Sequence, residues 1–194
     1  MSKKNAAIML FDDVEVLDFA GPFEVFSITN ELNNYRLLNV YTVAPTKNPI
    51  IAKNGLSVNP DYNFTEAPKP DLLIIPGGYG ARKVLRQPDA INWIRENSFT
   101  AEKVMSVCTG AFLLAKAGLL EGLKATTHYQ VLDTLAELAP NTEILRNERF
   151  VDNGKILTSA GVSAGIDMSL YVVELLYGKE EAKNTAKYIE YETI

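Results

Sequence analysis

VMSVCTGAFLLA, residues 104–115, joins an apolar run typical of a buried strand to an apolar run with helical spacing, and the chain's single cysteine stands at the junction. A thiol at such a turn is held clear of the backbone, beside the free N–H groups and positive end of the helix, which favour the thiolate. Cys108 is therefore a candidate nucleophile. The alternative is a small hydrophobe buried at a strand end, since free cysteines are among the most buried residues.

The residues on either side of Cys108 match half of the G-x-nucleophile-x-G elbow. Gly110 lies two residues after the cysteine, where the absence of a side chain lets a helix pack close to a strand. Ser106 stands where the pattern has its first glycine. Because half of the pattern is missing, the elbow alone is not sufficient evidence for a nucleophile.

Outward from this junction, strand-like and helix-like runs alternate along the chain. We expect buried strands at residues 6–11, 37–44, 71–75 and 103–107, and helices at 16–31 (started or broken at Gly21-Pro22), 89–97, 110–120, 131–138, 163–176 and 180–190. Asn54-Gly55 and Asn153-Gly154 predict hairpins within residues 49–64 and 149–160. This alternation predicts an α/β, flavodoxin-like three-layer sandwich with a mostly parallel central sheet, in which ligands bind at the carboxyl ends of the strands.

Length and composition limit the possible functions. At 194 residues we expect a single domain, 1–194, with 47% hydrophobic and 22% charged residues, as in ordinary globular proteins. The net charge of -5 and the lack of a basic run argue against a nucleic-acid partner. No run has the length of a signal peptide or a membrane span, and one cysteine allows no internal disulfide, so we expect a cytoplasmic protein without a membrane partner.

Two further features fall at strand ends, where a ligand would bind. Glycines at 77 and 78, after the strand at 71–75, can turn backbone N–H groups toward a developing negative charge, although a plain strand-exit turn has the same sequence. Asp18 precedes Gly21-Pro22 and is either a helix cap or a carboxylate that reaches the thiol. If it reaches the thiol, its charge raises the thiol pKa, and the two groups share a proton.

His128 is the only histidine of the chain, and a Cys–His hydrolase would require it as the base. The pattern favours a helix-capping or surface position over this role. One cysteine and one histidine without clustered carboxylates do not form a metal site.

Five ordered motifs carry a resemblance to a known family. LDFAGPFEVF, DLLIIPGGYG, SVCTGAFLLAKAGLL, ATTHY and GVSAGIDMSLYVVELL closely resemble, in this order, the ThiJ/PfpI superfamily of class I glutamine amidotransferase-like proteins. VCTG, ATTH and AGID look most like its isonitrile hydratase branch, which shares its domain with the N-terminal half of certain AraC-type regulators.

The resemblance implies roles for particular residues. Cys108 matches the nucleophile, Asp18 the acidic residue that contacts it, and Thr109 the residue that assists in the hydratase. Gly78 and Tyr79 would supply oxyanion N–H groups together with Thr109. His128 and Asp167 lie in family motifs, and we expect them to be pocket or structural residues. Protease-like members have a histidine directly after the cysteine, and Thr109 at this position argues against peptidase activity.

The resemblance implies a cofactor-free hydratase that adds water to an isonitrile and gives an N-substituted formamide. Cys108 would attack the terminal carbon, Asp18 would deliver the proton and then activate water, and Thr109 would orient the intermediate. The alternatives are a small-molecule or redox-sensing domain, a protease- or amidase-type enzyme, and a carbonyl-directed enzyme of the deglycase or glyoxalase type. We expect a small electrophilic substrate and, from the resemblance, a homodimer.

Overall fold

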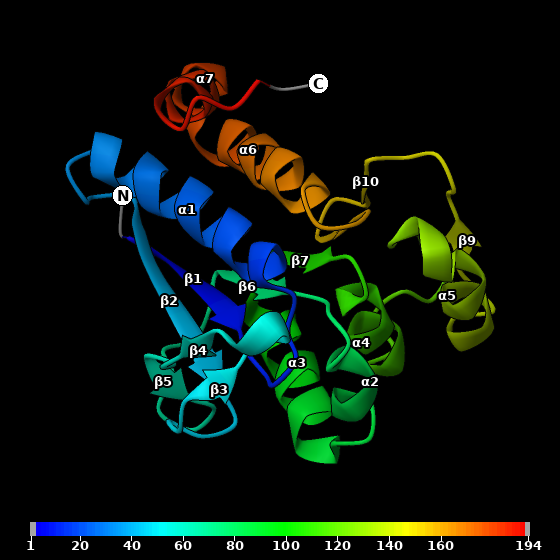
Figure 1. Ribbon diagram of the computed structural model, residues 1–194. Coiled ribbons are helices and arrows are strands. Elements are labelled where there is room, and N and C mark those ends of the chain that lie inside the picture. The colour runs from blue at the N-terminus through cyan, green and yellow to red at the C-terminus, as the bar shows by residue number, and fades with distance from the viewer. Residues whose placement is uncertain (1–2, 193–194) are drawn as a thin grey trace.

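A seven-stranded sheet forms the centre of the molecule, and the computed structural model describes it within residues 3–192 (Figure 1). The strand order is β10-β11-β7-β6-β1-β2-β5, and all neighbouring strands are parallel except β10, which runs antiparallel to β11. The strands span Lys4–Met9 (β1), Leu38–Ala44 (β2), Tyr62–Asn63 (β5), Leu72–Ile75 (β6), Lys103–Val107 (β7), Phe150–Asp152 (β10) and Ile156–Ser159 (β11). The predicted α/β class with a mostly parallel sheet is confirmed.

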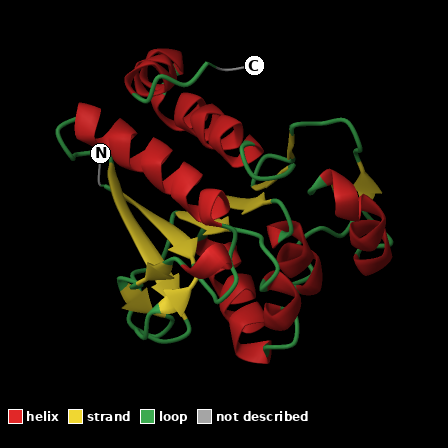
Figure 2. Cartoon of the chain, viewed as in Figure 1, coloured by secondary structure: helices red, strands yellow, loops and turns green. Residues whose placement is uncertain are grey.

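Helices cover both faces of this sheet (Figures 1 and 2). One layer holds α1 (Val16–Leu32), α6 (Ala164–Tyr177) and α7 (Lys179–Tyr188), which pack on one another. The other holds α2 (Ala81–Val84), α3 (Pro88–Thr100) and α4 (Gly110–Lys116), with α5 (Leu132–Leu138) beside α4. Strands covered on both faces need continuous apolar runs, and all four residues of β6 are accordingly buried.

Short elements complete the structure, and both predicted hairpins are confirmed. β3 (Ile50–Ile51) pairs antiparallel with β4 (Ser57–Val58) across η1 (Lys53–Gly55), and β10 pairs with β11 across residues 153–155. Five short elements were not predicted: β5, β8 (Lys124–Ala125), β9 (Glu143–Ile144), α2 and η2 (Tyr129–Val131). Elements of two to four residues are too short to establish a periodic pattern.

The expectation that Gly21-Pro22 starts or breaks the first helix is wrong. α1 runs without a break from Val16 to Leu32, with Pro22 inside it. The proline removes the N–H that would bond the carbonyl of Asp18. Packing of α1 against α6 and α7 compensates for this loss, and Gly21 faces Ile166 of α6, whose Cγ1 would lie 3.0 Å from an added Cβ.

The described residues contain neither a membrane-crossing helix nor a metal-binding cluster. No helix within residues 3–192 is both long and apolar enough to cross a bilayer. The same residues include no group of three or more His, Cys, Asp or Glu side chains placed to hold a metal ion.

Candidate active site

Cys108 stands on a strained turn between β7 and α4. Its φ is 54°, in the left-handed region that side chains rarely adopt, and its side chain is 7% exposed. The Cys108 N–H donates to the carbonyls of Ser159 and Ala160 at 3.3 and 3.1 Å, which holds the turn against β11. A Cβ at Gly110 would lie 2.1 Å from the Ile75 carbonyl oxygen, so only glycine permits this approach of α4 to β6. The strand-to-helix turn expected at Cys108 is therefore present.

Asp18 enters the site from the first turn of α1. Its side chain is fully buried, and the Gly77 N–H donates to Oδ2 at 3.0 Å. Oδ1 is buried and has no hydrogen-bond partner of good geometry within residues 3–192, while the Cys108 thiol lies close enough to stabilise the carboxylate charge. The structure thus brings together the carboxylate and the thiol that the sequence left 90 residues apart.

Burial controls the protonation of this pair. Desolvation, with a smaller contribution from the charge of Glu15, raises the pKa of Asp18 from 3.8 to about 7 against the opposing Gly77 hydrogen bond. Desolvation and the Asp18 charge raise the pKa of the Cys108 thiol from 9.0 to about 12. Between about pH 7 and pH 12 the pair therefore holds one proton.

The helix end favours the thiolate as expected, but larger effects raise the pKa of the Cys108 thiol. The N–H groups of Thr109 and Val162 do lower the pKa of the Cys108 thiol, as the position before α4 suggested. Burial and the nearby Asp18 carboxylate act in the opposite direction and are larger. The net shift is upward, as expected for a thiol that shares a proton with a carboxylate.

Thr109 and Gly78 bind each other, which changes the roles expected for both. The Gly78 N–H donates to Thr109 Oγ1 at 2.9 Å, and the Thr109 hydroxyl lies 3.1 Å from the Gly78 carbonyl oxygen. The Gly78 N–H is therefore engaged and does not point to an oxyanion, contrary to expectation. The Gly77 N–H is likewise used by Asp18, so the glycine turn positions the acid and Thr109.

A cavity of about 390 Å³ opens above Cys108. Besides Cys108, its wall includes the predicted residues Gly78, Tyr79, Thr109 and His128. His128 Nδ1 accepts a hydrogen bond from the Gln130 N–H at 3.3 Å, and its ring packs against Gly161 so closely that an added Cβ would meet Cδ2 at 2.3 Å. No hydrogen bond joins His128 to Cys108 in the described chain, so the ring is a wall of the cavity.

Asp167, expected to be a pocket or a structural residue, lies outside the Cys108 cavity. Its carboxylate pairs with Arg149 at 2.5 Å and accepts from the Tyr191 hydroxyl at 3.1 Å, while Arg149 also donates to Ser163 at 3.1 Å. This network ties α6 to β10 and to the C-terminal segment. Asp167 was expected in either a pocket or a structural role, and its contacts are of the structural kind.

Several cavity residues were missed in the sequence. Val162, with φ at 47°, directs its N–H toward the thiol, and Glu15, Lys53, Arg82, Gln130 and Val131 complete the wall. Val162 follows β11 as Cys108 follows β7, so its position at a strand's carboxyl end was the available signal. Lys53 comes from the β3–β4 hairpin and Arg82 from the short helix α2, neither of which has a catalytic sequence pattern, and Glu15 directly precedes α1.

Comparison with known proteins agrees with this geometry. The model of the DJ-1/PfpI family matches residues 4–175. The chain belongs to the DJ-1/PfpI family. It is 32% identical to isonitrile hydratase from Pseudomonas putida, over 94% of this chain and 76% of that protein. It is 25% identical to the transcriptional regulator GbdR of Pseudomonas aeruginosa, and there the match covers 98% of this chain but only about half (52%) of the regulator.

Solved structures share the fold throughout. A ThiJ/PfpI family protein from Pseudomonas syringae superposes with a TM-score of 0.90 at 28% identity, covering 100% of this chain and 77% of that one. Drosophila melanogaster DJ-1beta superposes with a TM-score of 0.86 at 20% identity, covering 100% of both chains. The family thus includes an enzyme, regulators and DJ-1 proteins on one architecture.

Proposed function

We propose that this protein is a cysteine-dependent hydratase that converts an isonitrile and water into an N-substituted formamide. The observation that carries the proposal is the buried Cys108–Asp18 pair, which holds one proton above about pH 7. Hydration of an isonitrile requires a nucleophile and a proton at the same carbon, and this pair supplies both. The similarity to isonitrile hydratase supports the choice of substrate.

The proposed reaction has two stages. In the first, the Cys108 sulfur forms a bond to the terminal carbon, and the proton shared with Asp18 moves to the same carbon, which gives a thioimidate. In the second, the Asp18 carboxylate takes a proton from water, and the hydroxide adds to the thioimidate carbon. The nitrogen takes the proton back from Asp18, and the C–S bond breaks as the hydroxyl becomes a carbonyl and gives its proton to the sulfur, so the formamide leaves with the thiol and carboxylate restored.

Backbone N–H groups would stabilise the intermediate. The N–H groups of Thr109 and Val162 lie at the sulfur, and Tyr79 lines the cavity beside them. We propose that the Thr109 N–H acts on the intermediate and that its hydroxyl, bound to Gly78, holds the turn in place. The Gly78 N–H has no part in this step.

Activity on a panel of simple alkyl isonitriles tests the proposal. We expect the wild-type protein to form the corresponding formamides, detected by mass spectrometry, and Cys108→Ala to form none while it retains the wild-type circular dichroism spectrum. Cys108→Ser serves as the matched control for the loss of sulfur alone. A wild-type protein inactive on the whole panel would rule out this substrate class.

A sensing domain is the second candidate, because the chain also matches transcriptional regulators. Oxidation requires an accessible thiolate, whereas Cys108 is buried and burial raises the pKa of its thiol. Peroxide treatment followed by intact mass distinguishes the candidates. Selective, reversible oxidation of Cys108 without turnover of any isonitrile would favour sensing.

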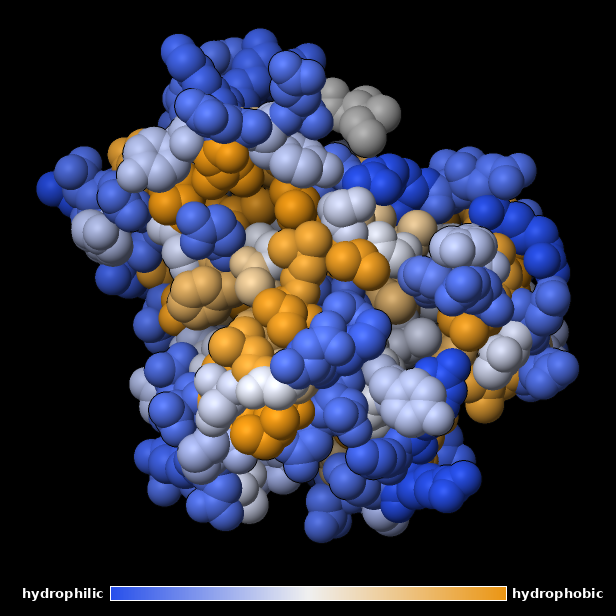
Figure 3. All heavy atoms as spheres, viewed as in Figure 1, coloured by the Kyte–Doolittle hydropathy of each residue, from blue (hydrophilic) through white to orange (hydrophobic). Residues whose placement is uncertain are grey.

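We also propose that the protein forms a homodimer, as the family resemblance implies. Figure 3 shows an apolar band that runs across α1 toward the β3–β4 hairpin, and the exposed side chains of Leu17, Ile51 and Leu56 belong to these segments. Light scattering is expected to give twice the mass of one chain and a single-chain mass for Leu56→Lys. A single-chain mass for the wild type at every concentration would exclude the dimer.

A further inference from the structure

Arg82 carries an uncompensated positive charge on the wall of the Cys108 cavity. The other cation of this wall, Lys53, is paired with Glu15 at 2.8 Å, so these two charges offset each other. Arg82 forms no ion pair with any carboxylate in the described part of the chain. The negative charge of the Cys108–Asp18 pair is fixed deep in the site, where it serves the chemistry.

Two aromatic rings hold the Arg82 guanidinium at the cavity. Its central carbon lies 5.4 Å from the centre of the Tyr79 ring and 5.9 Å from that of Phe112. Phe112 belongs to α4 and is buried, so the same helix that follows the nucleophile also fixes the cation. Contact with ring faces leaves the N–H edges of a guanidinium free, and such an edge matches a carboxylate with two parallel hydrogen bonds.

We propose that this cavity selects substrates that carry a carboxylate at the end remote from the reacting carbon, and that Arg82 binds this carboxylate. Under the proposed function, on which this inference rests, the substrate class is a carboxylate-bearing isonitrile. The isonitrile carbon meets Cys108 at the base of the cavity, and the anionic end lies at the wall formed by Arg82 and Tyr79. Arg82 is then a specificity-determining residue.

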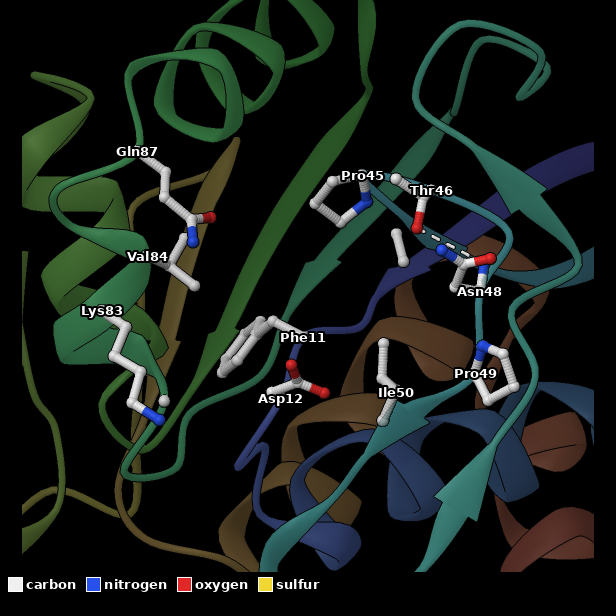
Figure 4. Close-up of a pocket in the computed structure, with 12 residues that line it drawn as sticks. Phe11, Asp12, Pro45, Thr46, Asn48, Pro49, Ile50, Lys83, Val84 and Gln87 are labelled. Atoms are coloured by element: carbon white, nitrogen blue, oxygen red, sulfur yellow. Dashed lines mark hydrogen bonds between the residues drawn. The ribbon is translucent and has the colours of Figure 1, made fainter.

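The neighbouring Lys83 provides a matched control. It is paired with Asp13 at 2.8 Å and lines a different cavity, of about 350 Å³, together with Phe11 and Asp12 (Figure 4). Lys83→Gln and Arg82→Gln each remove one positive charge by the same change, at adjacent positions of α2. Only Arg82→Gln removes a charge from the Cys108 cavity.

Alkylation of Cys108 tests the charge selection without requiring turnover. N-ethylmaleimide and 3-maleimidopropionate share the reactive ring, and only the second carries a remote carboxylate. The ratio of their rates, followed by intact mass, cancels any change in the amount of thiolate. We expect Arg82→Gln to lower the ratio of anionic to neutral reagent roughly fivefold, as for one solvent-exposed ion pair. Arg82→Lys should lower it less, and Lys83→Gln should leave it unchanged.

Turnover supplies the second measurement. We divide kcat/KM for isocyanoacetate by kcat/KM for its methyl ester. This ratio should be larger for the wild-type protein than for Arg82→Gln by a similar factor. An unchanged labelling ratio in Arg82→Gln, or an equal fall in Lys83→Gln, would overturn the role of Arg82 whether or not isonitriles are substrates. A fall confined to Arg82→Gln with no isonitrile turnover would uphold charge selection and reject the hydratase.

Discussion

Asp18→Asn is expected to stabilise the fold at alkaline pH while it removes the proposed proton carrier. The folded protein holds Asp18 in a fully buried position, where desolvation raises its pKa from 3.8 to about 7. In the unfolded chain the carboxyl ionises near its ordinary pKa, so folding disfavours the charged form. Ionisation of Asp18 therefore lowers the free energy of unfolding. This loss of stability is absent below about pH 4, grows between about pH 4 and 7, and is complete above pH 7.

The size of the effect follows from the pKa difference. A pKa raised from 3.8 to about 7 corresponds to about 4 kcal/mol of unfolding free energy above pH 7 and to less than half of that at pH 5. Asparagine keeps an oxygen that can accept from the Gly77 N–H but carries no charge. The stability gained by Asp18→Asn should therefore be about 3 kcal/mol larger at pH 8 than at pH 5.

Urea unfolding followed by the fluorescence of Trp93, the single and buried tryptophan, measures this difference at the two pH values. Glu24→Gln removes a carboxylate from an exposed position of the same helix and is the control. A stability gain that is equal at pH 5 and pH 8, or a loss at pH 8, would refute the argument that Asp18 is buried at an energetic cost.

Three further predictions test the site. Asp18→Asn should speed the alkylation of Cys108 by iodoacetamide at pH 8 about tenfold, because the Asp18 charge raises the thiol pKa; intact mass measures this, and a slower reaction would contradict it. His128→Gln should reduce isonitrile turnover less than Asp18→Asn does, since no hydrogen bond joins His128 to the thiol within residues 3–192; the reverse order in steady-state rates would favour a Cys–His mechanism. Gly110→Ala should destabilise the protein by about 2 kcal/mol or more, because the new Cβ would meet the Ile75 carbonyl oxygen at 2.1 Å; urea unfolding with no change in midpoint would show that α4 can move away.

Much of the fold was predictable because the spacing of apolar residues in a long run distinguishes a helix from a strand. The helices expected at 89–97 and 163–176 are present as Pro88–Thr100 and Ala164–Tyr177, and the strand expected at 103–107 is β7. The short helix α2 has too few residues for a period, and it carries Arg82. Pro22 was misread because local propensity disfavours proline inside a helix, whereas packing against α6 and α7 holds α1 together.

The sequence by itself determined the strand-to-helix turn at Cys108 and the glycine turn after β6, because both depend on neighbouring residues. Only the tertiary structure decided that Asp18 lies at the thiol, that Gly78 binds Thr109, and that Asp167 pairs with Arg149 outside the cavity. These contacts join segments brought together by a parallel sheet. The tertiary structure also decided the protonation of Cys108. Burial and the carboxylate of Asp18, which is remote in the sequence but close in space, raise the thiol pKa by more than the neighbouring helix end lowers it.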